Sequence, residues 1–228
     1  MGLVEGYHFT VETEGDSYGC VYIRREGLAY AAWLSVHGKG EQQRLAADFV
    51  EYILQRAEEA GENVRKKAEE IVGEGKERGS QTLKDFEREV EVDGKKYVVK
   101  VIDGGAFEEV RGGRKLLRIK ITAEAGRVEG EHIVDRVVRE YTITYSRRGS
   151  NNAAIGRAYA RADAPDGREE NARRLAAVIK ALTGVEPGII KRSDGKIEVV
   201  CGREHLDGFA HYAELADAIE KWLKETSR

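Results

Sequence analysis

Apolar and polar residues alternate in several short segments of this chain, and that two-residue period is typical of strands with one buried face. The clearest examples are residues 117–122, 141–146 and 157–162. An Asp-Gly pair at residues 93–94 separates two further alternating segments and predicts a tight hairpin. Another hairpin is predicted within residues 189–200. These patterns predict a largely antiparallel sheet.

Other segments give weaker strand signals. Residues 6–36 alternate around turn signals at residues 14–16 and 26–27, which predicts two or three strands. The glycine-rich stretch 103–114 is predicted to be a loop, and residues 126–138 fit either a loop or a short helix.

A four-residue apolar period predicts the helices. Leu45, Phe49 and Ile53 define a helix over 41–60, and a second stripe follows before a predicted linker at 73–82. Asp166 and Glu169 resemble a capping box that opens a helix over 168–184, closed by Thr183-Gly184. The last helix is predicted over 203–226.

Together these elements predict an α+β fold in which a curved antiparallel sheet carries helices 41–60, 168–184 and 203–226 on one face. We expect an N-terminal strand-helix unit at 1–82 and a C-terminal sheet-helix-hairpin-helix unit at 84–228. The letters RLAA occur at Arg44–Ala47 and again at Arg174–Ala177, each opening a helix. The repeat reflects either an internal duplication or chance.

The composition favours a protein from a hyperthermophile. Charged residues make up 35% of the 228-residue chain, whereas a quarter is usual, and Asn and Gln number four each. Many ions with few heat-labile side chains are typical of hyperthermophile proteins. A very soluble, helix-rich mesophile protein is the alternative.

Neither a membrane span nor a signal peptide is predicted. The longest apolar run, Leu28–Leu34, is far shorter than the roughly 18 residues that a span needs. We therefore expect a cytoplasmic protein. Cys20 and Cys201 are expected to be buried small hydrophobes, with a disulfide as the alternative.

The strongest functional signal is a local excess of positive charge. Residues 111–161 contain 12 Lys and Arg against 5 Asp and Glu, although the whole chain carries a net charge of −3. Such a strip on a sheet attracts phosphate backbones, which predicts contact with nucleic acid, DNA rather than RNA. Tyr159 is positioned to stack on a base or sugar. The predicted contact residues are Arg118, Lys120, Arg147, Arg148, Arg157, Tyr159 and Arg161. The alternative is a charged, solvated sheet face that discourages aggregation.

No residue cluster identifies a reaction, and we expect neither an enzyme nor a cofactor. Cys201 and His205 are too few ligands for zinc, so no metal site is predicted. Acidic residues that suit magnesium in a divergent nuclease show no pairing spacing; they are Glu12, Glu14, Asp16, Asp163 and Asp166. Trp222 and Tyr212 in the last helix suggest a protein-interaction or assembly module as the other alternative.

Residues 84–228 resemble the PaRep family, type 2b, a set of paralogous repeat proteins of hyperthermophilic crenarchaea. The resemblance rests on the runs LLRIKITAE, REYTITYSRRG, RAYARADAPDGRE, RLAAVIKALTGVEP, IIKRSDGKIEVVCGREHLDGF and ELADAIEKWLKET. That family has no established activity, so the resemblance implies a source and no mechanism.

The order of strands, helix, hairpin and helix is similar to one half of a LAGLIDADG homing endonuclease. This resemblance implies a saddle-shaped sheet that contacts DNA through basic and polar side chains. No segment carries the defining LAGLIDADG helix, and the acid–glycine pairs at residues 14–16 and 207–208 lie in a predicted turn and early in a predicted helix. The resemblance therefore implies a non-catalytic binding protein.

Overall fold

The structure is a computed structural model that describes residues 3–14, 18–150, 152–164 and 166–226. It forms two compact units, an N-terminal unit that extends to Ser80 and a C-terminal unit over Gln81–Thr226. The fold class is α+β, which confirms the prediction.

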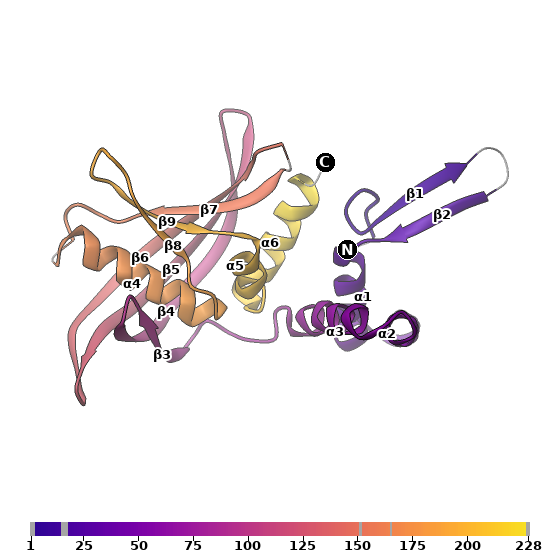
Figure 1. Cartoon of the computed structure of the whole chain (residues 1–228), viewed down its shortest axis with the longest axis horizontal. Coiled ribbons are helices and arrows are strands. Elements are labelled where there is room, and N and C mark those ends of the chain that lie inside the picture. Colours follow the sequence, from indigo (N-terminus) through magenta and orange to yellow (C-terminus); the bar gives the residue numbers. More distant parts are fainter. Residues whose placement is uncertain (1–2, 15–17, 151, 165, 227–228) are drawn as a thin grey trace. The chain divides into compact units, whose positions relative to one another are not determined.

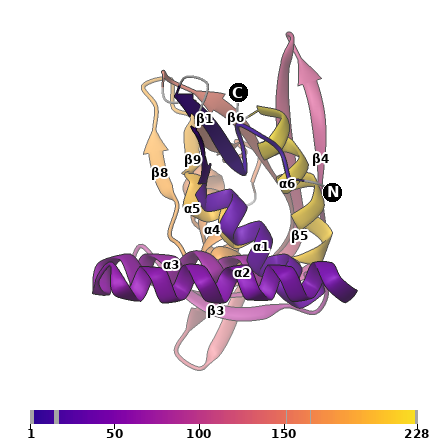
Figure 2. The same cartoon turned by 90° about the vertical axis from the view of Figure 1, so that its right-hand side faces the viewer.

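The described part of the N-terminal unit contains one hairpin followed by three helices. Its elements are β1 (Phe9–Glu14), β2 (Tyr18–Ile23), α1 (Arg25–His37), α2 (Gly40–Glu59) and α3 (Glu62–Glu77). Figure 2 shows α2 and α3 running side by side, and both pack against α1. Leu28 and Ala32 of α1, Val50 of α2 and Ile71 of α3 form the core.

Two predictions for this unit need correction. The segment after Ile23, expected to contribute strand, forms α1, because the apolar run Leu28–Leu34 lacks alternation and is rich in alanine, the best helix former. The helix predicted over 41–60 exists as α2, but within this unit it packs against α1 and α3, whereas the prediction placed it on the sheet.

The predicted linker at 73–82 begins later than expected because α3 continues to Glu77. Gly75 lies where α3 meets α1, and a Cβ at this position would come within 2.2 Å of the Ala29 carbonyl oxygen. This glycine therefore permits two helices to approach closely and does not end α3.

Within the described residues, the C-terminal unit contains a seven-stranded antiparallel sheet in the order β3-β4-β5-β6-β7-β9-β8. Its strands are β3 (Glu87–Val92), β4 (Lys95–Arg111), β5 (Arg114–Glu129), β6 (His132–Arg148), β7 (Ala153–Tyr159), β8 (Gly188–Lys191) and β9 (Ile197–Cys201). Its helices are α4 (Gly167–Thr183), α5 (Arg203–Phe209) and α6 (Ala213–Thr226). Figure 1 shows that the sheet curls, with helices against one face.

Alternating side chains on the central strands build the core of this unit. Leu117, Ile119 and Ile121 of β5 are fully buried and face the helices, as do Ile143 and Tyr145 of β6. The helices contribute a matching apolar side; α4 packs on β3, β4, β5 and β9, and α6 packs on β4 and β5. The curved sheet with α4, α5 and α6 on one face thus confirms the predicted architecture of this part.

The central strands are longer than predicted. Residues 103–111 continue β4 after a bulge, and residues 126–138 complete β5 and begin β6 around a turn at Gly130. The glycine-rich pattern predicts a loop, yet Gly104 is a packing position within β4. A Cβ there would lie 2.6 Å from the Leu83 side chain and 3.0 Å from Ile121.

Two helix predictions also need correction. Asp166 precedes α4 but makes no capping hydrogen bond, because its carboxylate pairs with Arg174. The predicted helix over 203–226 is divided into α5 and α6, because Gln81 bonds to the backbone between them: its N–H donates to the His211 carbonyl at 3.0 Å, and its carbonyl accepts from the Ala213 N–H at 2.9 Å.

The two RLAA segments lie in helices with different surroundings. Arg44–Ala47 lies in α2 of a helical unit, whereas Arg174–Ala177 lies in α4, which packs on the seven-stranded sheet. The described helices include none with both the length and the apolar character of a membrane span.

Gly156→Ala is expected to destabilise the C-terminal unit by about 1–3 kcal/mol, the usual range for an overpacked core. A Cβ at Gly156 would lie 2.6 Å from the ring of Tyr145, and Trp222 packs against the same buried ring at 6.4 Å between centroids. The Tyr145 ring therefore has little room to move. Urea unfolding followed by circular dichroism measures the change.

Gly105→Ala is the matched control, because a Cβ at Gly105 meets nothing within 4 Å. It should change the free energy of unfolding by less than about 0.5 kcal/mol. Equal effects of the two substitutions would contradict the packing argument.

Candidate nucleic-acid interface

The sheet of the C-terminal unit has one face opposite α4, α5 and α6, which we call the open face. Phe107, Arg118, Thr144 and Arg157 lie opposite one another across β4, β5, β6 and β7. Lys120 and Thr142 form the next pair along. Because Leu117 and Ile119 face the helices, Arg118 and Lys120 between them project from the open face. Three of the predicted cations, Arg118, Lys120 and Arg157, therefore share one surface.

An acidic partner accompanies each of these three cations. Arg118 pairs with Glu109, the Lys120 Nζ lies 3.3 Å from a Glu140 oxygen, and an Arg157 Nη lies 3.4 Å from a Glu198 oxygen. Sequence reasoning missed these partners, because the carboxylates come from other strands. The local excess of positive charge in the sequence is therefore largely balanced on this surface.

Two aromatic rings stand half-exposed on the open face. Tyr159 is 58% exposed and lies two residues beyond Arg157 on the same strand. Phe107 is 44% exposed, and the Lys120 Nζ lies 5.8 Å from the centre of its ring. Exposed rings beside cations and the hydroxyls of Thr142 and Thr144 give this face both stacking and hydrogen-bonding groups.

Glu198 is the one of these acids that is buried, at 1% exposure. Burial alone raises the pKa of this carboxyl, but hydrogen bonds from Arg192 and Tyr159 and the charge of Arg157 outweigh it, so the pKa of Glu198 is lowered. Arg192 Nε donates to Glu198 at 3.0 Å. Glu198, which lies opposite Tyr159 on β9, thus holds Arg157 and Tyr159 in place.

The remaining predicted contact residues do not all join this surface. Arg147 points to the helix side, where its guanidinium lies 5.0 Å from the centre of the Trp222 ring and its Nε donates to the Thr226 hydroxyl at 2.9 Å. Strand alternation could have shown this, because Arg147 is two residues from buried Tyr145.

Arg148 is exposed and donates to the Ser146 hydroxyl at 3.2 Å, on the open side. Arg161 lies beyond β7, and its Nη2 lies 2.7 Å from an Asp163 oxygen.

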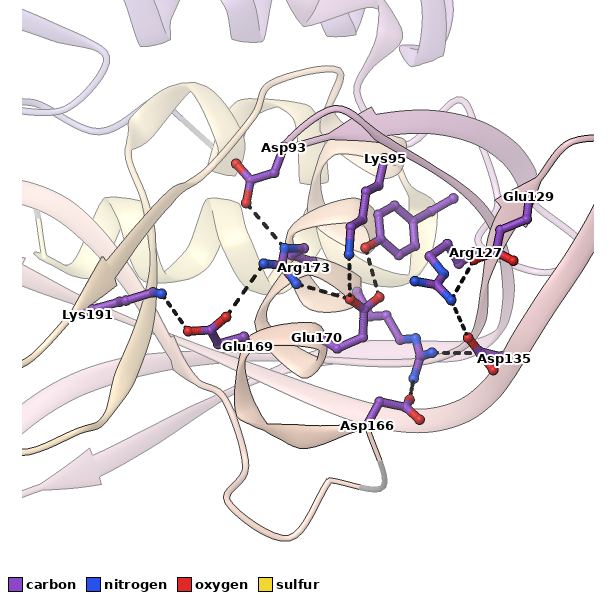
Figure 3. Close-up of polar contacts among 12 residues, drawn as sticks. Asp93, Lys95, Arg127, Glu129, Asp135, Asp166, Glu169, Glu170, Arg173 and Lys191 are labelled. Atoms are coloured by element: carbon purple, nitrogen blue, oxygen red, sulfur yellow. Dashed lines mark hydrogen bonds and ion pairs between the residues drawn. The ribbon is translucent and has the colours of Figure 1, made fainter.

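A polar network that sequence reasoning did not find joins the start of α4 to the sheet (Figure 3). Glu170 accepts a hydrogen bond from Tyr97 at 2.8 Å and pairs with Arg173 at 3.1 Å. Burial would raise the pKa of Glu170, but these hydrogen bonds and the charge of Lys95 lower it overall. Burial and the bond to Glu170 raise the pKa of Tyr97. This network anchors α4 to β4.

The described acids among those considered for magnesium do not assemble into a site. Asp163 and Asp166 are held by Arg161 and Arg174, and Glu12 lies on the exposed hairpin of the N-terminal unit. Asp16 and the Glu14 side chain lie outside the described residues. The described residues include no group of three or more His, Cys, Asp and Glu able to hold a metal ion.

Other sequence expectations have mixed outcomes. Trp222 and Tyr212 are buried, so they cannot support the predicted assembly role as surface aromatics. Cys201 is buried as expected, whereas Cys20 is exposed, and both are free thiols. His205 lies at the start of α5, and its Nδ1 accepts the Gly202 N–H at 3.1 Å, as expected for a polar residue at a helix start.

Comparisons with known proteins leave the PaRep and LAGLIDADG resemblances as predictions. No family model, curated protein or solved structure matches the chain.

Proposed function

We propose that the C-terminal unit binds single-stranded nucleic acid on its open face without catalysing a reaction. The observation that carries the proposal is a set of cations and rings on one face of three strands, β4, β5 and β7: Phe107, Arg118, Lys120, Arg157 and Tyr159. Cations of this kind contact phosphates, and half-exposed rings stack on bases.

The balanced charge favours single strands over duplexes. Duplex DNA is recognised first through its backbone charge, and Glu109, Glu140 and Glu198 weaken that attraction here. Base stacking on Phe107 and Tyr159 requires unpaired bases and does not depend on net charge.

The acidic partner of Lys120 does not block this cation. An exposed ion pair contributes only about 0–1 kcal/mol, so a phosphate can replace the Glu140 carboxylate beside Lys120 at small cost. The Lys120 and Glu140 side chains are both more than a third exposed and open to exchange.

A fluorescence-anisotropy titration with labelled single strands of DNA and RNA, and with the matching duplex, tests the proposal. We expect tighter binding to a single strand than to the duplex, and a log–log salt slope of about −2 for three phosphate contacts. Tyr159→Ala is expected to weaken binding about 5- to 100-fold, the usual loss for one stacked base. Glu140→Gln is expected to strengthen binding because it frees Lys120.

Tyr52→Ala is the matched control, since Tyr52 is an exposed tyrosine on α2 of the other unit. It should leave the affinity unchanged. Undetectable binding at micromolar protein concentrations would reject the proposal. So would an affinity that changes neither with salt concentration nor in Tyr159→Ala.

A further inference from the structure

Three buried donors on the helix side of β6 have no hydrogen-bond acceptor among the described residues. They are the Tyr141 hydroxyl, Nη1 of Arg139 and Nε of Arg174. Tyr141 is 5% exposed and Arg174 is 2% exposed. A buried donor without an acceptor destabilises a fold, so three in one region require an explanation.

The backbone brings these donors to one place. Arg139 and Tyr141 alternate on β6, opposite Ala123 and Ile121, so both side chains project to the side that carries α4. Arg174 lies in the second turn of α4 and reaches β6, where its Nη2 donates to the Asp135 carbonyl at 2.9 Å. Burial raises the pKa of Tyr141 to about 12, while the charges of Arg139 and Arg174 act on it in the opposite sense. The hydroxyl therefore remains a donor at neutral pH.

The surrounding charges favour an anion. Asp135, Asp163 and Asp166 lie close by, but they are paired with Arg127, Arg161 and Arg174 respectively (Figure 3 shows Asp135 and Asp166). Glu129 shares Arg127 with Asp135. The Nη1 of Arg139 has no hydrogen-bond partner among the described residues, and the charge of Arg139 acts on Tyr141 and Asp163. The first turn of α4 starts beside Asp166 and adds the partial positive charge of a helix N-terminus.

We propose that Arg139, Tyr141 and Arg174 form a binding site for a phosphate group. The guanidinium groups of Arg139 and Arg174 are donors only, and the Tyr141 hydroxyl can donate as well as accept, so two positive charges favour an anion over a neutral ligand. Donors from two elements suit an anion with several oxygens. Asp135 and Asp166 beside the site are exposed, so the buried donors lie close to the surface. Because Tyr141 and Thr142 project from opposite faces of β6, the site is independent of the proposed function of the open face.

Isothermal titration of the full chain with inorganic phosphate, and thermal unfolding in phosphate and in chloride at equal ionic strength, test this proposal. We expect saturable binding of phosphate and a rise in Tm that chloride does not produce. Arg139→Gln is expected to weaken phosphate binding about tenfold or more, the loss for a charge-assisted hydrogen bond.

Tyr141→Phe separates ligand binding from folding. It removes a donor that has no acceptor, so it should not lower Tm in chloride, yet it should reduce the rise in Tm that phosphate causes. Tyr212→Phe is the matched control, because the Tyr212 hydroxyl donates to the Leu182 carbonyl at 3.1 Å. It should lower Tm equally in both solutions.

Oligonucleotides with and without a 5′-phosphate distinguish the source of the group. If the phosphorylated strand binds more tightly and inorganic phosphate competes with it, the site exists and its ligand is the end of a strand. If inorganic phosphate binds but the two strands bind equally, the site exists and its ligand is a small phosphate compound. A phosphate effect equal to that of chloride, or one that persists in both Arg139→Gln and Tyr141→Phe, overturns the proposal.

Discussion

Trp222→Ala is expected to lower the free energy of unfolding of the C-terminal unit by about 3–5 kcal/mol, the usual cost of truncating a buried tryptophan. The Trp222 side chain is fully buried. Its indole N–H donates to the Lys115 carbonyl at 3.2 Å, and its ring lies under the Arg147 guanidinium. Truncation therefore leaves a cavity between α6 and the sheet and removes the partner of a β5 carbonyl. Urea unfolding followed by far-ultraviolet circular dichroism measures the loss.

Val110→Ala is the control for this measurement, because it truncates an exposed side chain of β4 without opening the core. Its effect on the free energy of unfolding should stay within about 0.5 kcal/mol. If Trp222→Ala were no more destabilising than this control, the packing of α6 on the sheet would be wrong.

Glu198→Gln is expected to destabilise the protein by about 1–3 kcal/mol at neutral pH, because it removes the buried charge that Arg157 and Arg192 share. The pKa of Glu198 is lowered in the folded state, so its carboxylate stabilises the fold above the unfolded-state pKa of about 4.3. That contribution is lost as the pH falls through the lower, folded-state pKa. The difference between wild type and variant should therefore shrink below about pH 4.

Unfolding curves across this pH range test the prediction. Glu131→Gln, an exposed glutamate in the turn between β5 and β6, is the matched control and should change stability little at any pH. If the difference in free energy of unfolding between wild type and Glu198→Gln stayed constant below about pH 4, the carboxylate charge would not be what stabilises the site.

The parts of the fold that sequence predicted best have a strict period. The alternation of Leu117, Ile119 and Ile121 with charged residues is sufficient to assign β5, because one face of that strand meets a core. The same logic correctly places Arg118 and Lys120 together. The apolar run in α1 has no such period, and glycines such as Gly104 serve packing that only the neighbouring strand reveals.

The candidate sites were only partly visible in the sequence for a related reason. The acids that balance the open face reach it through strand pairing; Glu140, for example, meets Lys120 only because β5 and β6 adopt one register. The donors of the phosphate site come from β6 and α4, which are joined by tertiary packing. In contrast, the burial of Trp222 had a local signal, since Leu215, Ile219 and Trp222 recur at helical spacing along α6.

The strand β6 contributes its even-numbered residues Thr142 and Thr144 to the open face and its odd-numbered residues Arg139 and Tyr141 to the opposite side. Inserting or deleting a single amino acid within this stretch would reverse the direction of the side chains on one side of the change. Hydroxyls would then enter the apolar interior and aromatic rings would enter solvent. Homologous chains should therefore tolerate length variation in the β5–β6 and β6–β7 turns but keep the distance from Arg139 to Ser146 constant.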